Sequence, residues 1–597
     1  MKKSLLFALL ASLSVECSFA QGAIQNVMGR ERTSLNGTWN ALTDIQNTGK
    51  KGWGKINATR NSSTSLRELC YEGDITLEVP GDWNHQDRAF FYYEGIMWYQ
   101  RYFDYAPQDD KIVLLHFGAV SMHCTVFVNG EEIGTHRGGF TPFQFDVTDK
   151  LLPGENYIVL SVDNIRSETT IPAYAFDWWN YGGITRDVDL VYLPKSYIAD
   201  YKLSLKDNRR DELDIWVKLE GESVANREVV VSIPEAKLKL KLKTDERGEA
   251  TAQRKLKLKL WSPESPKLYD VALSSELDKV EDKIGFRTIE VSGEDILLNG
   301  EPIFLRGINI HEEIAAEQRR SCTQADAEFL VGQAKDLGCN FIRLSHYAHN
   351  EYMVREAERQ GFLMWEEIPV WQNIKLKDPA VCDYARGMMQ EMICRDKNRC
   401  GIIMWSISNE VRSYKERNIF FAEFVREVKA TDPTRLVTSA LNGPQVTEED
   451  GKFYMTHKDP LINELDVVGI NKYMGWYQPF PCPAAELNWR IAPGKPVIVS
   501  EFGSECVYGN HEGDTSNLNS WSEDYMSQNY RDNIASFNNF PNLRGTAPWI
   551  LFDFRSPRRP HAQFQRGWNR KGLISPEGGR KEAWHVMREF YESKKQQ

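Results

Sequence analysis

Two glutamates each close a short apolar run, a position at which an ionisable side chain needs a chemical reason. Glu410 ends residues 405–410, which read Trp-Ser-Ile-Ser-Asn-Glu, and Glu501 ends residues 496–501, which read Pro-Val-Ile-Val-Ser-Glu. Glycoside hydrolysis with retention needs two carboxyl groups about 5 to 5.5 Å apart, one to attack the anomeric carbon and one to give and then take a proton. The two runs therefore predict acid/base and nucleophilic chemistry on a sugar.

The residues beside the two glutamates divide the roles between them. Asn409 directly precedes Glu410, so its amide can bond the sugar's 2-hydroxyl while Glu410 reaches the leaving oxygen. We therefore assign Glu410 as the acid/base and Glu501 as the nucleophile. The alternative is that both glutamates are only hydrogen-bonded to the rim of a barrel, and either run alone would not decide between the two interpretations.

The elements that would position these glutamates follow residue 287, where strands begin to alternate with helices. Thr323 and Asp326 have the spacing of a capping box at a helix start, and Gly338 and Gly361 stand where helices should end. A closed parallel barrel needs eight strands and carries its active site at their carboxyl ends. The expected strands are residues 303–310, 341–345, 362–365, 402–408, 436–439, 467–470, 497–500 and 546–551.

The part of the chain before residue 288 has the pattern of two all-β domains. Residues 21–194 contain short runs in which apolar and polar residues alternate, separated by turn pairs such as Asn129-Gly130. This pattern predicts a β-sandwich. Residues 195–287 add a second set of strands, including the lysine/leucine alternations 237–242 and 255–260. Period-two alternation places one face of a sheet on a core and the other in water, so the lysines predict a solvated face rather than a binding patch.

Composition bounds the class of protein. The chain has 597 residues, 41% hydrophobic content and a formal net charge of −11 without a long block of like charge, which argues against nucleic acid as a partner. Lys2 and Lys3, an apolar run and small residues up to Ala20 predict a signal peptide over 1–20 and export to a bacterial periplasm. A lipid anchor at Cys17 is the alternative. No later run is apolar enough for membrane insertion, and the cysteines lack the spacing of a metal site.

Several longer motifs resemble the signatures of family 2 of the glycoside hydrolases. They are residues 304–312 (Phe-Leu-Arg-Gly-Ile-Asn-Ile-His-Glu), 341–347, 405–410 and 500–503, with supporting matches at 177–184 and 261–269. The resemblance implies a jelly-roll-like sugar-binding domain over 21–194, an immunoglobulin-like β-sandwich over 195–287 and a catalytic (β/α)8 TIM barrel over 288–597. It implies no cofactor.

The substrate is indicated by residues 567–572, Gly-Trp-Asn-Arg-Lys-Gly. They resemble the Asn-x-Lys-Gly motif by which β-glucuronidases of the family hold the C6 carboxylate of the sugar, which would give Asn569 and Lys571 that role. An anionic sugar in a pocket that already holds an ionised glutamate needs a cation. The expected substrates are β-glucuronide conjugates or glucuronate-containing oligosaccharides. The alternative is a loop of surface cations near a basic carboxyl-terminal segment.

Further site residues are implied by the same resemblance. Asn471 and Tyr473 match residues that approach the nucleophile, Tyr477 one that contacts the carboxylate, and Trp549 a tryptophan that stacks on the sugar ring. His311 and Asp177 match positions that hold distal hydroxyls, with Asp177 reaching in from the first domain. Arg343 and His346 would orient the two carboxylates. An extra arginine of some glucuronidases has no match in register, although Arg566 is near.

Several questions stay open at this point. The same fold and mechanism could act on β-galactosides or β-galacturonides, because the configuration at C4 depends on contacts that the sequence does not resolve. A noncatalytic carbohydrate-binding protein is disfavoured because both glutamates are present. The connection after Trp371 is short, which predicts an open leaving-group side that suits oligosaccharides. The sequence also leaves a homo-oligomer open.

Overall fold

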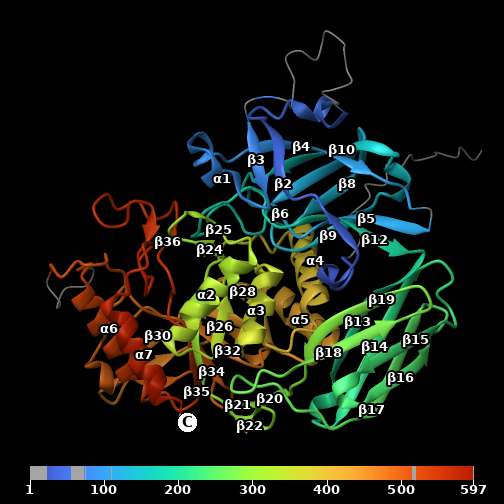
Figure 1. Ribbon diagram of the computed structural model, residues 1–597. Helices are drawn as coiled ribbons and strands as arrows, with labels where there is room; N and C mark the ends of the chain where they lie inside the picture. Colours follow the sequence, from blue (N-terminus) through green and yellow to red (C-terminus); the bar gives the residue numbers. More distant parts are fainter. Residues whose placement is uncertain are drawn as a thin grey trace, which may run out of the picture.

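The protein folds into three blocks that follow one another along the chain (Figure 1). The computed structural model describes residues 23–55, 71, 73, 75–108, 110–513 and 520–595. The first block (blue to cyan) is a β-sandwich, the second (green) is another sandwich, and the third (yellow to red) is a barrel ringed by helices. The predicted signal peptide and Cys17 lie outside the described residues.

The first sandwich has two antiparallel sheets whose strands alternate between core and solvent. In β7, for example, Cys124, Val126 and Val128 are buried and the residues between them are partly exposed. Its six-stranded sheet has the order β3 (Thr76–Val79), β2 (Gly37–Thr43), β4 (Ile96–Tyr105), β10 (Gly154–Asp163), β7 (His123–Val128) and β8 (Glu131–Arg137). The facing sheet has the order β1 (Arg32–Ser34), β12 (Val188–Pro194), β5 (Lys111–Phe117) and β9 (Phe143–Asp146).

The second sandwich confirms the immunoglobulin-like prediction but corrects one of its strands. Residues 256–260 form no strand, because their backbone finds other partners: Leu256 N–H donates to the oxygen of Asp211 and Lys259 N–H to the hydroxyl of Tyr269, both at 2.8 Å. The first alternation does form β16, with Leu238 buried. The sheets are β13 (Ser196–Leu205), β14 (Glu212–Gly221) and β17 (Glu249–Lys255), and β16 (Leu238–Lys243), β15 (Glu228–Ile233), β18 (Leu268–Ser274) and β19 (Lys279–Gly285).

The third block is a closed parallel barrel of eight strands, as predicted. All eight residues of β28 and all five of β34 are buried, since both faces of a barrel strand are covered. The strands are β23 (Leu305–Ile310), β26 (Phe341–Leu344), β27 (Leu363–Glu367), β28 (Ile402–Asn409), β29 (Leu436–Asn442), β32 (Val468–Asn471), β34 (Val497–Glu501) and β35 (Leu543–Thr546). Both predicted catalytic glutamates therefore stand at a carboxyl end, Glu410 just after β28 and Glu501 as the last residue of β34.

The position of the eighth strand differs from the prediction of residues 546–551. β35 ends at Thr546, and the Ala547 and Pro548 carbonyls instead accept hydrogen bonds from the side chain of Asn309 at 2.9 and 3.0 Å. The buried residues after Thr546 are not part of a named strand, although their backbone still bonds its barrel neighbours: Ala547 N–H donates to the Val499 oxygen at 2.8 Å and Leu551 N–H to the Asn309 oxygen at 3.0 Å. The hydrophobic residues of this segment correctly indicated burial, but they did not show where the strand begins and ends.

Helices surround the barrel and have the ends that the sequence indicates. Thr323 and Asp326 form the predicted capping box of α2, and Gly338 and Gly361 end α2 and α3 with φ of 91° and 89°. Such left-handed backbone favours glycine. The long helices are α2 (Gln324–Leu337), α3 (Glu351–Gln360), α4 (Pro379–Asp396), α5 (Lys415–Thr431), α6 (Glu523–Phe537) and α7 (Glu582–Ser593).

The first sandwich is fixed to the barrel by buried polar contacts. Arg186 forms an ion pair with Glu312 after β23 at 3.2 Å, and both side chains are at most 4% exposed. Trp178 packs between His346 and Trp371 of the barrel, with ring centroids 5.5 and 5.9 Å away. These contacts hold the segment after β10, which carries Asp177, against the carboxyl-terminal mouth of the barrel.

Two further properties bear on the class of protein. Within the described ranges, no helix is long and apolar enough to span a membrane. The described cysteines are all free thiols, and several are buried, such as Cys124, Cys400 and Cys506.

Candidate active site

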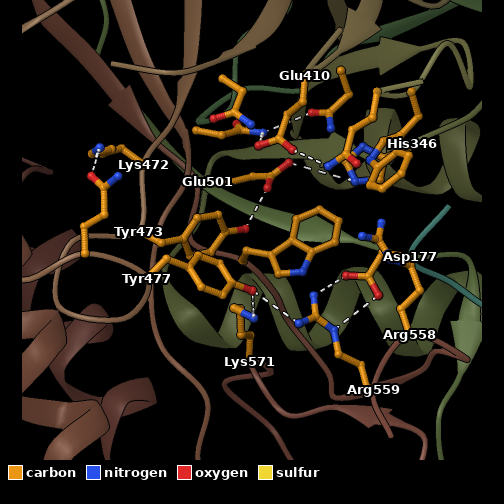
Figure 2. A pocket seen from close by; sticks show the side chains of 17 residues that line it. Asp177, His346, Glu410, Lys472, Tyr473, Tyr477, Glu501, Arg558, Arg559 and Lys571 are labelled. Atoms are coloured by element: carbon orange, nitrogen blue, oxygen red, sulfur yellow. Dashed lines mark hydrogen bonds and ion pairs between the residues drawn. The ribbon is translucent and has the colours of Figure 1, made fainter. Parts of the chain in front are cut away.

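A cavity of about 430 Å³ opens at the carboxyl ends of the barrel strands, and Glu410 and Glu501 both line it (Figure 2). The structure brings most of the sequence-predicted site residues to this cavity, from elements far apart in the chain. The predicted residues that line it are Asp177, His346, Asn409, Glu410, Asn471, Tyr473, Tyr477, Glu501, Trp549 and Lys571.

Glu501 is buried, and donors contact both of its carboxyl oxygens. Arg343 donates to Oε1 at 2.7 Å, and the Tyr473 hydroxyl donates to Oε2 at 2.6 Å. Burial raises the pKa of Glu501 to about 7, with Arg343 and Tyr473 opposing the rise and nearby Glu410 adding to it. The two donors orient the carboxylate as an attacking group requires.

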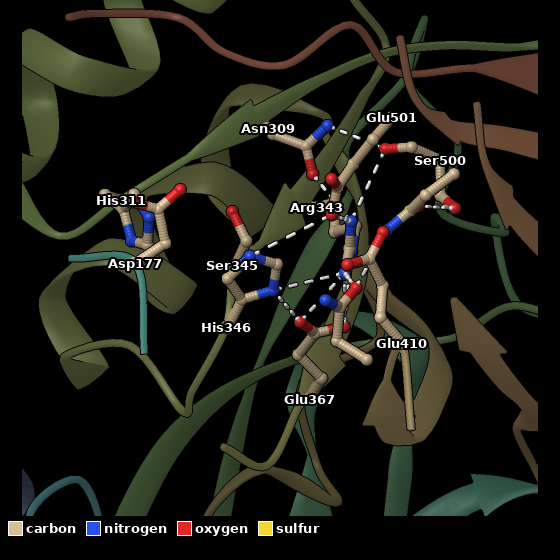
Figure 3. Close-up of polar contacts among 12 residues, drawn as sticks. Asp177, Asn309, His311, Arg343, Ser345, His346, Glu367, Glu410, Ser500 and Glu501 are labelled. Atoms are coloured by element: carbon tan, nitrogen blue, oxygen red, sulfur yellow. Dashed lines mark hydrogen bonds and ion pairs between the residues drawn. The ribbon is translucent and has the colours of Figure 1, made fainter. Parts of the chain in front are cut away.

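Arg343 is fully buried at the end of β26 and links most of the polar groups below the cavity floor (Figure 3). Besides Glu501, it contacts Glu367 at 3.0 Å and the side-chain oxygen of Asn409 at 2.8 Å. His346 completes the network, with Nδ1 2.6 Å from Glu367. Burial alone would raise the pKa of Glu367, but Arg343 and His346 lower it below its usual value. These contacts fit the orienting role predicted for Arg343 and His346.

Glu410 is held in a different way. It adopts left-handed backbone, with φ of 56°, which turns its side chain out of the β28 direction into the cavity. Its two oxygens accept from amides, Oε2 from Gln372 at 2.8 Å and Oε1 from Asn471 at 3.1 Å. Asn471 also donates to Asn409 at 3.1 Å, so one side chain positions both neighbours.

Lys571 lies at the opposite end of the cavity and is only 1% exposed. Its ammonium forms an ion pair with Glu505 at 2.8 Å and donates to the hydroxyl of Tyr477 at 3.0 Å. The rings of Tyr473, Trp476 and Tyr477 lie 5.6, 5.8 and 5.0 Å from Nζ, within the range of cation–π attraction. The lysine is therefore fixed in place as a cation facing the cavity.

Asp177 of the first sandwich meets Arg559 beside this lysine. The two form an ion pair, and Arg559 also donates to the Tyr477 hydroxyl at 3.2 Å (Figure 2). Asn569 lies behind them, fully buried, with Nδ2 3.5 Å from Asp177 and its Oδ1 accepting from the backbone N–H of Lys571 at 3.2 Å. Asn569 thus supports the cavity wall without lining it.

His311 also lies outside the cavity lining. Its Nδ1 is 3.2 Å from the Tyr347 hydroxyl, its ring packs edge-on against Trp549, and burial holds its pKa well below the usual value. Trp549 does line the cavity, and His346 stacks on it with ring centroids 4.7 Å apart. The structure therefore places His311 behind the tryptophan that would meet the sugar ring. The side chain of Arg566 is exposed and donates to the backbone oxygen of Ala562 at 3.0 Å, away from the cavity lining.

Comparison with known proteins matches all three blocks to one family. Family models of the glycosyl hydrolases family 2 match the sugar binding domain over residues 33–194, a further domain over 196–287, and the TIM barrel domain over 289–530. The chain belongs to family 2 of the glycosyl hydrolases. It is an enzyme, and not the noncatalytic carbohydrate-binding protein that the sequence left open.

This family 2 hydrolase is similar over nearly its whole length to proteins of known type. The β-glucuronidase of Paenibacillus borealis is 25% identical, with 94% of this chain and 97% of the relative covered. A solved β-glucuronidase of Bifidobacterium dentium, complexed with coumarin-3-O-glucuronide, has a TM-score of 0.82 at 25% identity. The match covers 97% of this chain and 99% of the solved chain. A GH2 β-galacturonidase of Eisenbergiella tayi bound to galacturonate shares the fold, with a TM-score of 0.77 at 24% identity and coverage of 95% and 98%.

Several site residues of this family 2 hydrolase were not found from its sequence. Gln372 contacts Glu410, Glu505 pairs with Lys571, and Arg559 pairs with Asp177. A signal existed for two of them. Glu505 is a second carboxylate close after Glu501, and Arg559 belongs to the proline-flanked pair Arg558-Arg559 shortly before the Asn-x-Lys-Gly segment. Gln372 carries no comparable signal.

Proposed function

We propose that this enzyme is a retaining, exo-acting β-glucuronidase. One observation carries the proposal: a buried lysine, Lys571, faces the same cavity as the two glutamates and is fixed there by Glu505 and Tyr477. A neutral sugar has no use for this cation at C6, whereas a glucuronate carboxylate can accept from Lys571 and from the Arg559 guanidinium beside it. Hydrogen bonds to charged groups contribute about 1.5 to 3 kcal/mol each.

In the first chemical step, Glu501 attacks the anomeric carbon. Its carboxylate oxygen forms an ester bond to that carbon while the bond to the leaving oxygen breaks, and Glu410 gives its proton to the leaving oxygen. Arg343 and Tyr473 hold Glu501 in line through the contacts at 2.7 and 2.6 Å. The amide of Asn409 is available for the 2-hydroxyl of the sugar.

In the second step, the glycosyl-enzyme ester is hydrolysed. Glu410, now ionised, takes a proton from water as the water oxygen bonds to the anomeric carbon, and the ester bond to Glu501 breaks. The product is glucuronic acid in the β-configuration. The Lys571 and Arg559 end of the cavity is assigned to the terminal sugar, which supports exo action.

The second candidate function is hydrolysis of β-galacturonides, which also carry a C6 carboxylate. The observation that favours it is the ion pair between Asp177 and Arg559. Asp177 is the predicted partner of a distal hydroxyl, so that hydroxyl would face a carboxylate and a guanidinium together. Such a pair offers both an acceptor and a donor to the C4 hydroxyl in either configuration.

The experiment that tests the proposal compares initial rates on aryl β-glucuronide, β-galacturonide, β-galactoside and β-glucoside for the wild type and Lys571→Ala. We expect preference for the glucuronide, with kcat/KM falling at least about tenfold to a hundredfold in the variant. Galactoside turnover that is indifferent to Lys571 would refute the uronate assignment. Preference for galacturonide would select the second candidate. NMR of the first product anomer tests retention.

A further inference from the structure

A second cavity of about 300 Å³ lies beside the catalytic one. Its wall is built from the segment after Glu410, the end of β29, and the hairpin of β30 (Gln445–Glu449) and β31 (Lys452–Thr456) with the residues that follow it. Asn442, the last residue of β29, lines both cavities and is exposed. The two cavities are therefore adjoining parts of one surface depression.

The charged groups of this second cavity are mostly cationic. Arg412 and Lys458 line it, and both are exposed. Within the described part of the chain, neither has an ion-pair partner. The carboxylate in the lining, Asp459, is already paired with the buried Arg417 at 2.7 Å. An anion entering this cavity would meet two uncompensated cations and no unpaired carboxylate of the lining.

His457 adds a polar ring to the lining of the second cavity. Its Nε2 is buried without a hydrogen-bond partner among the described residues, although the ring lines the cavity. Burial lowers the pKa of His457, and the positive charges of Arg417 and Lys472 lower it further against the opposing effect of Asp459. Lys472 lines the catalytic cavity, and its ammonium donates at 2.9 Å to the backbone oxygen of Pro444, which lies between two lining residues of the second cavity, Gly443 and Gln445.

The position of the second cavity relative to the acid decides what it would bind. Glu410 gives its proton to the leaving oxygen, so the leaving group departs on the Glu410 side, and Arg412 follows Glu410 by two residues. Lys571 and Asp177 occupy the far end of the catalytic cavity (Figure 2). We propose that the second cavity binds the leaving-group part of an oligosaccharide and that the sugar ring held there is anionic. This inference rests on the proposed glucuronidase function.

The test compares four glucuronides that differ only in the leaving group. They are an aryl β-glucuronide, a disaccharide of glucuronate linked to a neutral sugar, and disaccharides in which the second ring carries a carboxylate or a sulfate. The variants are Arg412→Ala, Lys458→Ala and the double variant. Arg426→Ala on the exposed face of α5, outside both cavities, removes the same charge and is the matched control.

We expect the wild type to prefer the anionic disaccharides over the neutral one. Each single variant should lower kcat/KM for them about three- to tenfold while the aryl glucuronide and the Arg426→Ala control stay unchanged. The wild-type preference should also shrink between 50 and 500 mM salt, since exposed charges are screened. Comparing the disaccharide that carries a carboxylate with the one that carries a sulfate then shows which anion the second cavity prefers.

Two results would overturn the inference while leaving the enzyme's function intact. One is equal wild-type turnover of neutral and anionic disaccharides alongside good aryl glucuronide turnover. The other is an equal loss for all substrates in Arg412→Ala and Lys458→Ala, which would indicate damage to the catalytic cavity instead. Absence of turnover on every glucuronide, including the aryl one, would refute the proposed function itself.

Discussion

Replacing Glu505 by Gln removes the negative charge that faces Lys571 in the catalytic cavity. The two side chains are each 1% exposed and their charged atoms lie 2.8 Å apart. Glutamine keeps the size of the side chain, so packing with Gln565 and Arg559 changes little. What changes is that Lys571 becomes a buried cation whose remaining described partners are the Tyr477 hydroxyl and the surrounding aromatic rings.

The magnitude follows from the pKa of Glu505. Burial alone would raise this pKa, but Lys571 and Arg559 lower it from the ordinary 4.5 to about 2. A shift of that size corresponds to about 3 kcal/mol of folding free energy, and removing one partner of a buried ion pair costs about 3 to 5 kcal/mol. Because the folded pKa is depressed, this stabilisation is present above pH 4.5 and is lost as the pH falls towards 2.

The assay is thermal unfolding of the wild type and Glu505→Gln, each with saturating D-glucuronate or D-glucose. At pH 7 the unfolding temperature of the variant should be about 5 °C below that of the wild type. This difference in unfolding temperature should become smaller with glucuronate, because the sugar carboxylate supplies the missing negative charge beside Lys571. Glu276→Gln, an exposed acid paired with Arg227, is the control and should change little. Equal glucuronate protection of variant and wild type would refute the reasoning that the sugar carboxylate meets Lys571.

Three further outcomes are expected. Glu410→Gln and Glu501→Gln should each lower kcat about a thousandfold or more, with azide restoring turnover of Glu410→Ala as the β-azide and of Glu501→Ala as the α-azide; substantial activity of either glutamine variant would contradict the roles. kcat/KM should fall as the pH drops below about 7, because Glu501 then becomes protonated. The hydrogen bond from Tyr473 lowers the pKa of Glu501, so Tyr473→Phe should raise that pKa and move the acid limb of the profile to higher pH. An acid limb that does not move would argue against the contact. Since burial raises the pKa of Glu501, its folding contribution is lost as the pH rises from about 4.5 through 7, so Glu501→Gln should gain thermal stability over the wild type more at pH 8 than at pH 5; a gain independent of pH would exclude the charge as its cause.

The fold could be predicted where burial and strand structure coincide. Parallel barrel strands are covered on both faces, so their apolar runs mark them directly, as for β28 and β34. The errors fall where residues are buried without belonging to a sheet. Leu258 packs on the second core and Trp549 is buried after the end of β35, yet neither residue belongs to a strand. An apolar pattern predicts which side chains are buried. It does not predict which backbone groups pair with each other in a sheet.

The candidate site could be predicted where its residues adjoin strand ends or a known motif. Glu410, Glu501 and Lys571 belong to such segments and line one cavity. Arg559 was missed because it acts through Asp177, which lies 382 residues earlier in the chain. Gln372 was missed because its role depends on a loop that returns to Glu410. Such partners are set by the packing of loops, for which the sequence carries no periodic signal.

The contacts of the carboxylates also give a physical reason for the roles proposed for Glu410 and Glu501. Glu501 contacts the cation Arg343, Glu505 contacts Lys571, and Asp177 contacts Arg559. Glu410 differs from all of them, because its described partners are the amides of Gln372 and Asn471. A guanidinium carries a full positive charge and so strongly favours an ionised partner, whereas a neutral amide that donates an N–H favours it much less. The nucleophile must be ionised and the acid must carry a proton when the substrate binds. The arrangement therefore supports Glu501 as the nucleophile and Glu410 as the acid, independently of the motifs in which they occur.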